Sequence, residues 1–242
     1  MPEAILAGVF GLLIGSFLNV CIHRWPRDLS VVRPRSRCPT CQRRIAAYDN
    51  IPVLSWLLLR ARCRHCAAPI HWRYPLVEIL TGLCFFWFVA QRGLSPAALK
   101  YCVFAAMLLA LTFSDLETLL LPDQFTIGGF FIGIAFAPFV EIPDTTFRFV
   151  ANLAGASPGP RIASVGEALL GSLLPAGALW LTGWLFAKLR DKEGLGFGDV
   201  KMIAMIGAFL GLRGALLTII LGSIAGSVIG LIYIKATRQD TA

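Results

Sequence analysis

An apolar stretch near the N-terminus, AILAGVFGLLIGSFLNVC (residues 4–21), leads directly into the basic segment IHRWPR (residues 22–27). A helix of about 20 apolar residues is long enough to cross the hydrocarbon core of a bilayer. No Lys or Arg precedes the stretch and many follow it, which is the reverse of the order in a cleaved signal peptide. We therefore expect a retained membrane helix, with its N-terminal end outside and its C-terminal end in the cytoplasm.

The composition of the chain agrees with a membrane protein. It is 57% hydrophobic and 15% charged, whereas soluble domains carry about 25% charged residues. Because backbone groups in lipid must be satisfied within each spanning segment, every span should be a helix. The sequence predicts an all-α polytopic membrane protein with about seven transmembrane helices, within a range of six to eight. The expected helices cover residues 4–22, 75–91, 98–114, 125–140, 166–187, 201–212 and 214–234.

Counting crossings from an outside N-terminus assigns a side to each loop. Residues 23–74, 114–124 and 188–201 should be cytoplasmic, and residues 91–97 and 141–165 should be outside. The segment 201–212 is too short to span alone, so it is expected to be tilted, re-entrant or broken. The outside loop 141–165 either contacts a partner or merely links helices. The predicted domains are a first helix (1–22), a cytoplasmic loop (23–74) and a multi-helix domain (75–242).

Positive charge is concentrated in the first cytoplasmic loop. The net charge of the chain is +8, and the loop holds eleven arginines against Asp28 and Asp49: Arg24, Arg27, Arg33, Arg35, Arg37, Arg43, Arg44, Arg60, Arg62, Arg64 and Arg73. A basic loop beside a membrane helix is typical of the cytoplasmic side and of a surface attracted to anionic lipid. This placement argues against nucleic acid as a partner.

The same loop contains two C-x-x-C pairs, Cys38/Cys41 and Cys63/Cys66. Two such knuckles can supply four thiolates to one tetrahedral zinc ion. A closed four-sulfur site leaves no position for water, so its role should be structural. Disulfides are the competing interpretation, but they are disfavoured in a cytosolic loop.

Carboxylates are scarce in this chain, and ionisable groups at membrane depth are candidates for function. Loop acids such as Asp49 and Asp144 are interpreted as solvated charges. Five acids stand out by their place next to apolar runs: Glu78, Asp115, Glu117, Asp123 and Asp199.

Asp199 follows a glycine-rich segment that includes Gly196 and Gly198. Glycines there would allow unusual dihedral angles and close approach of an extended peptide. The crossing count places Asp199 on the same face as Asp115 and Asp123. Two neighbouring carboxylates share one proton, and such a pair can hydrolyse a peptide bond without metal. The residues alone do not decide whether Asp115 or Asp123 is the partner of Asp199.

An ordered set of motifs resembles the bacterial type IV prepilin peptidases, a bifunctional family of leader peptidases and N-methyltransferases. The motifs are GSFLNV (residues 15–20), CPTC (38–41), DNIPVLSW (49–56), CRHC (63–66), RYPLVE (73–78), Asp115 with LPD (121–123), and GFGDVK (196–201). The resemblance covers roughly residues 8–215.

The resemblance implies an intramembrane aspartic endopeptidase that acts on prepilins or pseudopilins at the cytoplasmic face of the bacterial inner membrane. Its catalytic aspartates correspond to Asp115 and Asp199. Asp123 would either support the geometry of the site or bind substrate, and Lys201 closes the second motif. Cleavage would follow a Gly, and the new N-terminal residue would be methylated from S-adenosylmethionine. Many relatives have Gly two residues before the third zinc cysteine, where this chain has Ala61, and this departure bears on the methyl transfer.

A different class of function is a non-enzymatic transporter or assembly scaffold. Its aspartates would relay protons and its zinc loop would dock a partner. Relay acids usually lie near the middle of the bilayer, whereas these acids lie near predicted helix ends. The enzymatic interpretation is therefore preferred.

Overall fold

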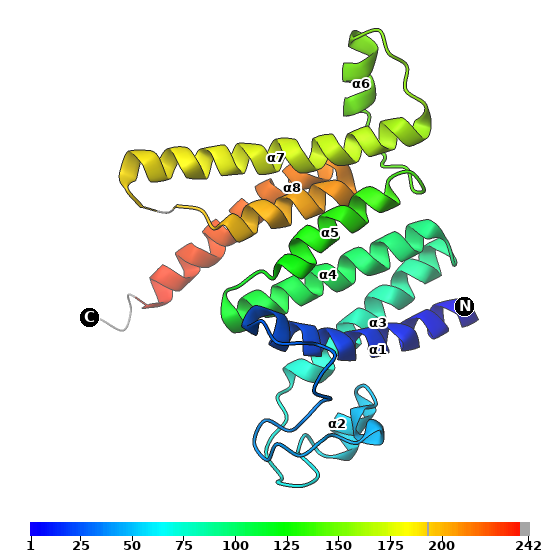
Figure 1. The fold of residues 1–242 in the computed structure, drawn as a ribbon, viewed down its shortest axis with the longest axis vertical. Coiled ribbons are helices and arrows are strands. Elements are labelled where there is room, and N and C mark those ends of the chain that lie inside the picture. The colour runs from blue at the N-terminus through cyan, green and yellow to red at the C-terminus, as the bar shows by residue number, and fades with distance from the viewer. Residues whose placement is uncertain (193, 238–242) are drawn as a thin grey trace. The chain divides into compact units, whose positions relative to one another are not determined.

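The computed structural model describes residues 1–192 and 194–237, and this part of the chain is helical without a sheet (Figure 1). Five helices are long and apolar enough to cross a membrane: α1 (Pro2–Arg24), α3 (Arg73–Arg92), α4 (Pro96–Thr118), α7 (Pro160–Arg190) and α8 (Phe197–Thr237). Helix α5 (Asp123–Phe136) is apolar but shorter. These elements confirm the predicted all-α polytopic class.

Residues 1–129 form one compact unit, in which α1, α3 and α4 pack against one another. Glycines on α1 bring its backbone close to α3. A Cβ atom at Gly11 would lie 2.9 Å from the Cα of Gly82, and one at Gly15 would lie 2.6 Å from the Cα of Glu78. Such small residues are common where membrane helices pack closely.

The loop between α1 and α3 carries short elements only. They are the 3₁₀ turns η1 (Trp25–Arg27) and η2 (Ala47–Asn50), and the helix α2 (Leu54–Leu58). Figure 1 shows this loop, in blue to cyan, joining the C-terminal end of α1 to the N-terminal end of α3. The expected zinc-knuckle loop between the first and second membrane helices is therefore present.

Residues from 130 onward form a second compact unit, in which α7 packs along α8. The two helices touch at Gly171 and Gly207, where an added Cβ at either position would clash with the backbone of the other helix. Helix α5 ends at Phe136, earlier than the expected residue 140, because Pro138 follows and disfavours helical geometry in the residue before it.

Helix α8 is broken at Gly211, which has φ 77° and ψ −173°. The predicted helices 201–212 and 214–234 correspond to the two halves of α8, so the sixth segment is a broken helix. The loop before α7 supports the break. The carboxylate of Asp144 accepts a hydrogen bond from the backbone N–H of Arg213 at 3.0 Å, which satisfies a donor at the start of the second half of α8.

The loop 141–165, which was expected to lie outside, is thus built into the second unit and contains the helix α6 (Thr146–Leu153). The N–H of Ile142 donates to the hydroxyl of Ser164 at 3.1 Å, and the N–H of Phe147 donates to the carboxylate of Glu167 at 2.6 Å. The loop therefore does more than link two helices.

Candidate functional site

The two cysteine knuckles have the same backbone geometry. The N–H of Gln42 donates to the carbonyl of Cys38 at 2.9 Å, and the N–H of Ala67 donates to the carbonyl of Cys63 at 3.0 Å. Gln42 and Ala67, each directly after the second cysteine of its pair, have φ of 58° and 56°. Each pair thus forms a tight turn that presents two thiols on one side.

The four sulfur atoms fit a zinc ion. Those of Cys38, Cys41, Cys63 and Cys66 all lie within 4.8 Å of one another, and the Cys38 and Cys66 sulfurs are 3.7 Å apart. Tetrahedral zinc–sulfur bonds of about 2.3 Å require sulfurs about 3.8 Å apart. Backbone N–H groups of Cys41 and Thr40 donate to the Cys38 sulfur and lower its pKa to about 6. The donor set is therefore suited to zinc, and all seven cysteines are free of disulfides.

Asp49 holds the second knuckle in place. The guanidinium of Arg64, within the second C-x-x-C pair, donates from Nε to Oδ2 of Asp49 at 2.8 Å and from Nη2 to Oδ1 at 2.6 Å. These bonds hold the pKa of Asp49 below its usual value. The Asp49 side chain is only 8% exposed, so its interpretation as a solvated loop charge is wrong: the carboxylate is a structural partner of the zinc loop.

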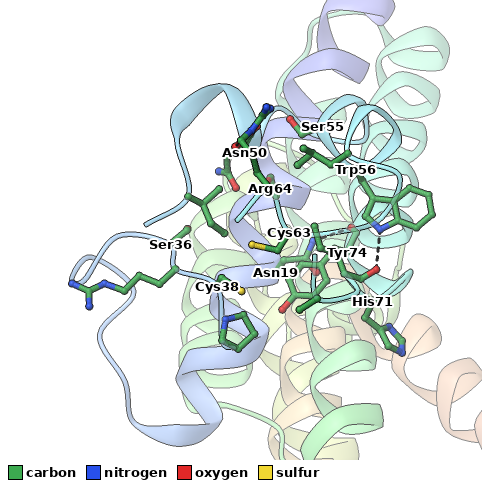
Figure 2. Close-up of a pocket in the computed structure, with 18 of the residues that line it drawn as sticks. Asn19, Ser36, Cys38, Asn50, Ser55, Trp56, Cys63, Arg64, His71 and Tyr74 are labelled. Atoms are coloured by element: carbon green, nitrogen blue, oxygen red, sulfur yellow. Dashed lines mark hydrogen bonds and ion pairs between the residues drawn. The ribbon is translucent and has the colours of Figure 1, made fainter. Parts of the chain in front are cut away.

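A cavity of about 400 Å³ lies between the zinc loop and the adjoining ends of α1 and α3. Figure 2 shows Asn19 and Tyr74 beside each other in its wall, close to Cys38 and Cys63. The side-chain amide of Asn19 donates to the carbonyls of Gly15 and Tyr74, at 3.3 and 3.0 Å. Its Oδ1 atom is buried without a hydrogen-bond partner. Asn19 thus ties the start of α3 to α1 in the wall of the cavity, while its own Oδ1 atom is closed off from the cavity.

Glu117 joins the helix ends next to this loop. Its carboxylate accepts from Arg73, and it lies 3.3 Å from both Arg27 and His23. These contacts bring the C-terminal ends of α1 and α4 and the N-terminal end of α3 to one end of the first unit. Glu117 stood out as a scarce acid, and its contacts with two arginines and with His23 give it a structural role.

Asp115 and Asp123 differ in their helical positions, although both are exposed. Asp123 lies in the first turn of α5, where the helix dipole stabilises a carboxylate. Asp115 lies in the last turn of α4, which ends at Thr118, where the dipole disfavours negative charge. The helix dipole therefore does not explain why a carboxylate is present at the end of α4, and this favours a functional role for Asp115.

Asp199 lies in the first turn of α8, and its N–H donates to the carbonyl of Gly196 at 3.1 Å. The expected unusual dihedral angles are absent at Gly196 and Gly198, since neither has a positive φ. Open space is present, however, because a Cβ at Gly196 would meet only the Asp199 carboxylate, at 3.6 Å. The Lys201 ammonium lies 5.4 Å from the ring centroid of Phe197.

The structure places the proposed partners in different units. Asp115 and Asp123 belong to residues 1–129, and Asp199 belongs to the unit that begins at residue 130. The pairing of the aspartates therefore stays a prediction. Glu78, in contrast, has a defined partner, because its Oε2 accepts from the N–H of Val53 at 2.7 Å.

Besides Asp49, two further acids were misjudged or missed in the sequence. Asp144, interpreted as a solvated loop charge, is 6% exposed and accepts hydrogen bonds from Thr145, Thr146 and Arg213. Glu167 is 1% exposed within α7. This acid was missed, although its place in a long apolar run could have identified it as a buried carboxylate. Asn19 lay within the GSFLNV motif, but nothing in its spacing indicated an unused acceptor.

The sequence matches two family profiles. The profile of the bacterial peptidase A24 N-terminal domain matches residues 9–92, and that of the type IV leader peptidase family matches residues 102–231. No solved structure matches the chain.

Curated relatives are named prepilin leader peptidase/N-methyltransferase. One from Myxococcus xanthus is 42% identical over 98% of this chain and 64% of its own length. Relatives from Aeromonas hydrophila and Stutzerimonas stutzeri are 37% and 35% identical, over 97% and 96% of this chain and 83% and 82% of their own lengths. The chain thus spans less than two thirds of the Myxococcus relative.

These matches agree with the motif resemblance, and they do not favour the transporter or scaffold alternative. The family profile over residues 102–231 contains both Asp115 and Asp199, and the four-cysteine cluster lies within the N-terminal match. The chain, with its several membrane helices, belongs to the type IV leader peptidase family of proteases.

Proposed function

We propose that the protein removes the leader peptide from type IV prepilins or pseudopilins at the cytoplasmic face of the bacterial inner membrane. The observation that carries the proposal is the match of the leader peptidase profile to residues 102–231, which include both Asp115 and Asp199. The placement of Asp115 at the end of the first unit that bears the basic loop supports a cytoplasmic active site, because basic loops face the cytoplasm.

The chemistry follows from one proton shared between two carboxylates. The ionised member takes a proton from water, whose oxygen attacks the scissile carbonyl carbon, while the protonated member donates its proton to the carbonyl oxygen. When the intermediate collapses, the C–N bond breaks and the leaving amine receives the proton taken from water. Asp115 and Asp199 are the proposed pair, and Asp123 is proposed to support the geometry of the site.

The test is leader removal from a purified prepilin in detergent by three matched variants and one control. Asp115→Asn and Asp199→Asn should each slow cleavage by about 10²- to 10⁴-fold, the usual contribution of a general acid or base. Asp123→Asn should slow cleavage less than either, as expected of a supporting residue, and Glu141→Gln, at an exposed loop acid, is the control and should keep full activity. Normal cleavage by either of the first two variants would contradict the proposed pair.

We also propose that the protein methylates the new N-terminal residue of the cleaved substrate. S-adenosylmethionine, when bound, supplies the electrophilic methyl group. The cavity beside the zinc loop is the proposed site for this donor, since its volume of about 400 Å³ lies within the range of small-molecule sites. Asn19, which donates to the Tyr74 carbonyl at 3.0 Å in the cavity wall, would hold the lining of this site in shape. Residues 23–74, with the adjoining ends of α1 and α3, would then serve methyl transfer, and the aspartates within residues 75–242 would serve cleavage.

Binding of S-adenosylhomocysteine, measured by calorimetry, tests the donor site. Asn19→Leu should weaken binding at least tenfold, while zinc content and leader removal stay unchanged. Asn152→Leu, on α6 in the second unit, is the control and should bind normally. Unaltered binding by Asn19→Leu would reject the cavity as the site, and absence of labelled methyl transfer alongside normal cleavage would reject the methylation itself.

A further inference from the structure

The short helix α2 presents a leucine face that no packing in the first unit accounts for. Leu54, Leu57 and Leu58 are 49%, 59% and 73% exposed. Their spacing of three and four residues places them on one side of the helix. Ser55, on the other side, is buried. A face of this kind on a loop in water would be unfavourable, since transfer of apolar surface out of water is favourable.

The depth of α2 follows from its contact with α3. Val53, the residue that precedes α2, donates its N–H to Glu78 Oε2 at 2.7 Å. Glu78 lies level with Gly15 of α1, whose added Cβ would come within 2.6 Å of the Glu78 Cα. Gly15 is seven residues before Ile22, the last apolar residue of α1, a distance of about 10 Å along a helix. The loop therefore turns back along the membrane helices, and α2 begins beside their membrane-embedded part.

The polar groups around α2 are satisfied by protein, as lipid requires. Besides the Val53–Glu78 bond, the N–H of Ile51 donates to the Ser55 hydroxyl at 3.0 Å, and this hydroxyl donates to the carbonyl of Tyr48 at 2.9 Å. The indole N–H of Trp56 donates to a carbonyl of the loop, that of Ile70, at 3.1 Å.

Charge is placed as expected for a helix at the lipid boundary. Arg60 and Arg62 directly follow α2, and both are exposed. Arginines next to an apolar helix face suit the anionic headgroups of the cytoplasmic leaflet. The leucine face is thus bounded by basic residues, in the same loop that both α1 and α3 tether to the membrane.

We infer that α2 is inserted in the cytoplasmic leaflet, with Leu54, Leu57 and Leu58 among lipid acyl chains and with Glu78 positioning the helix. The zinc loop is then fixed to the membrane at three places, namely the end of α1, α2 and the start of α3. This inference does not depend on the proposed reactions, and it gives Glu78 a specific task.

The test measures the depth of a nitroxide label on Leu58→Cys. The zinc-loaded full chain is reconstituted in vesicles of phosphatidylethanolamine and phosphatidylglycerol, with Cys84→Ala as background because Cys21 and Cys102 are buried and the other four cysteines bind zinc. Collisions with oxygen report lipid, and collisions with a water-soluble nickel chelate report solvent. Leu13→Cys, exposed on α1, is the lipid control, and Val32→Cys, exposed in the loop, is the solvent control.

The label at position 58 should behave like the label at position 13. A nickel accessibility like that of position 32 would overturn the inference, and so would protection from both reagents, which would mean that protein covers α2. As a second variant, Glu78→Leu should shift the label at position 58 toward solvent with zinc content unchanged. An unshifted label in that variant would remove the positioning role of Glu78.

Discussion

At the scale of single residues, the backbone of Ala61 adopts a conformation that suits glycine. Its φ is 57°, and its N–H and carbonyl are held by the Trp56 carbonyl at 2.8 Å and the Ile70 N–H at 2.7 Å. A non-glycine residue in the left-handed conformation destabilises the folded state by about 1–2 kcal/mol. A glycine avoids this strain, but it lowers stability by about 0.4–1 kcal/mol because it gives the unfolded chain more conformational entropy. Ala61→Gly should therefore stabilise the loop by roughly 0.5–1 kcal/mol, the difference between these costs.

The readouts are the thermal midpoint of the zinc-loaded protein in detergent and the rate of zinc release to a chelator. Ala61→Gly should raise the midpoint and slow the release. Ala61→Val, whose branched side chain is worse in this region, should do the opposite. A lower midpoint for the glycine variant would show that the loop relaxes around Ala61 without strain.

At the scale of elements, the break in α8 depends on a carboxylate from a distant loop. Burial raises the pKa of Asp144, but hydrogen bonds from Arg213, Thr146 and Thr145 outweigh this and hold its pKa below the usual value. Asp144→Asn should lower stability by about 1–3 kcal/mol, the usual range for bonds to a charged group. Because the folded pKa is depressed, this contribution is present above the unfolded pKa of about 3.9 and is lost as pH falls through the folded value.

Thermal unfolding of the wild type and Asp144→Asn between pH 7 and pH 3 measures this contribution. The gap between their midpoints should persist to about pH 4 and close below it. Glu141→Gln, an exposed neighbour in the same loop, should have no effect. A gap that is the same at every pH would mean that the charge of Asp144 does not matter.

The same elements show what the sequence could predict. Apolar length predicted the five long apolar helices, and C-x-x-C spacing predicted the cluster of four cysteines, because both signals are local. For the short segment 201–212, the sequence left open whether the helix is tilted, re-entrant or broken. It could not predict the break at Gly211, because the side chain that supports the break, Asp144, lies 67 residues earlier in the chain. Likewise, the choice between Asp115 and Asp123 as the partner of Asp199 had no physical basis in the sequence. It gained one only from the positions of the two residues within their helices.

At the scale of the whole molecule, metal binding and cleavage are assigned to different parts of the chain. The four cysteines that could bind zinc lie between residues 38 and 66, away from the proposed aspartates in sequence. Zinc removal by a chelator, or Cys38→Ser with Cys66→Ser, should unfold the loop, since such sites supply folding energy. Methyl transfer should then fall to background, while leader removal keeps the larger part of its rate.

Metal analysis, tryptic digestion at the loop arginines and both activity assays on one preparation test this separation. Restored zinc should restore protection and methyl transfer together. Loss of cleavage in proportion to lost zinc, with methyl transfer intact, would reverse the assignment of the two parts.

The central claim is that Asp115 and Asp199 act as one catalytic pair. Residues that act as a unit are strongly non-additive, so the decisive measurement is the rate of leader removal by the double variant Asp115→Asn/Asp199→Asn beside each single variant. We predict that the double variant is no slower than the single ones. A double variant slowed by the product of the two single effects, or a single variant with normal activity, would contradict the claim.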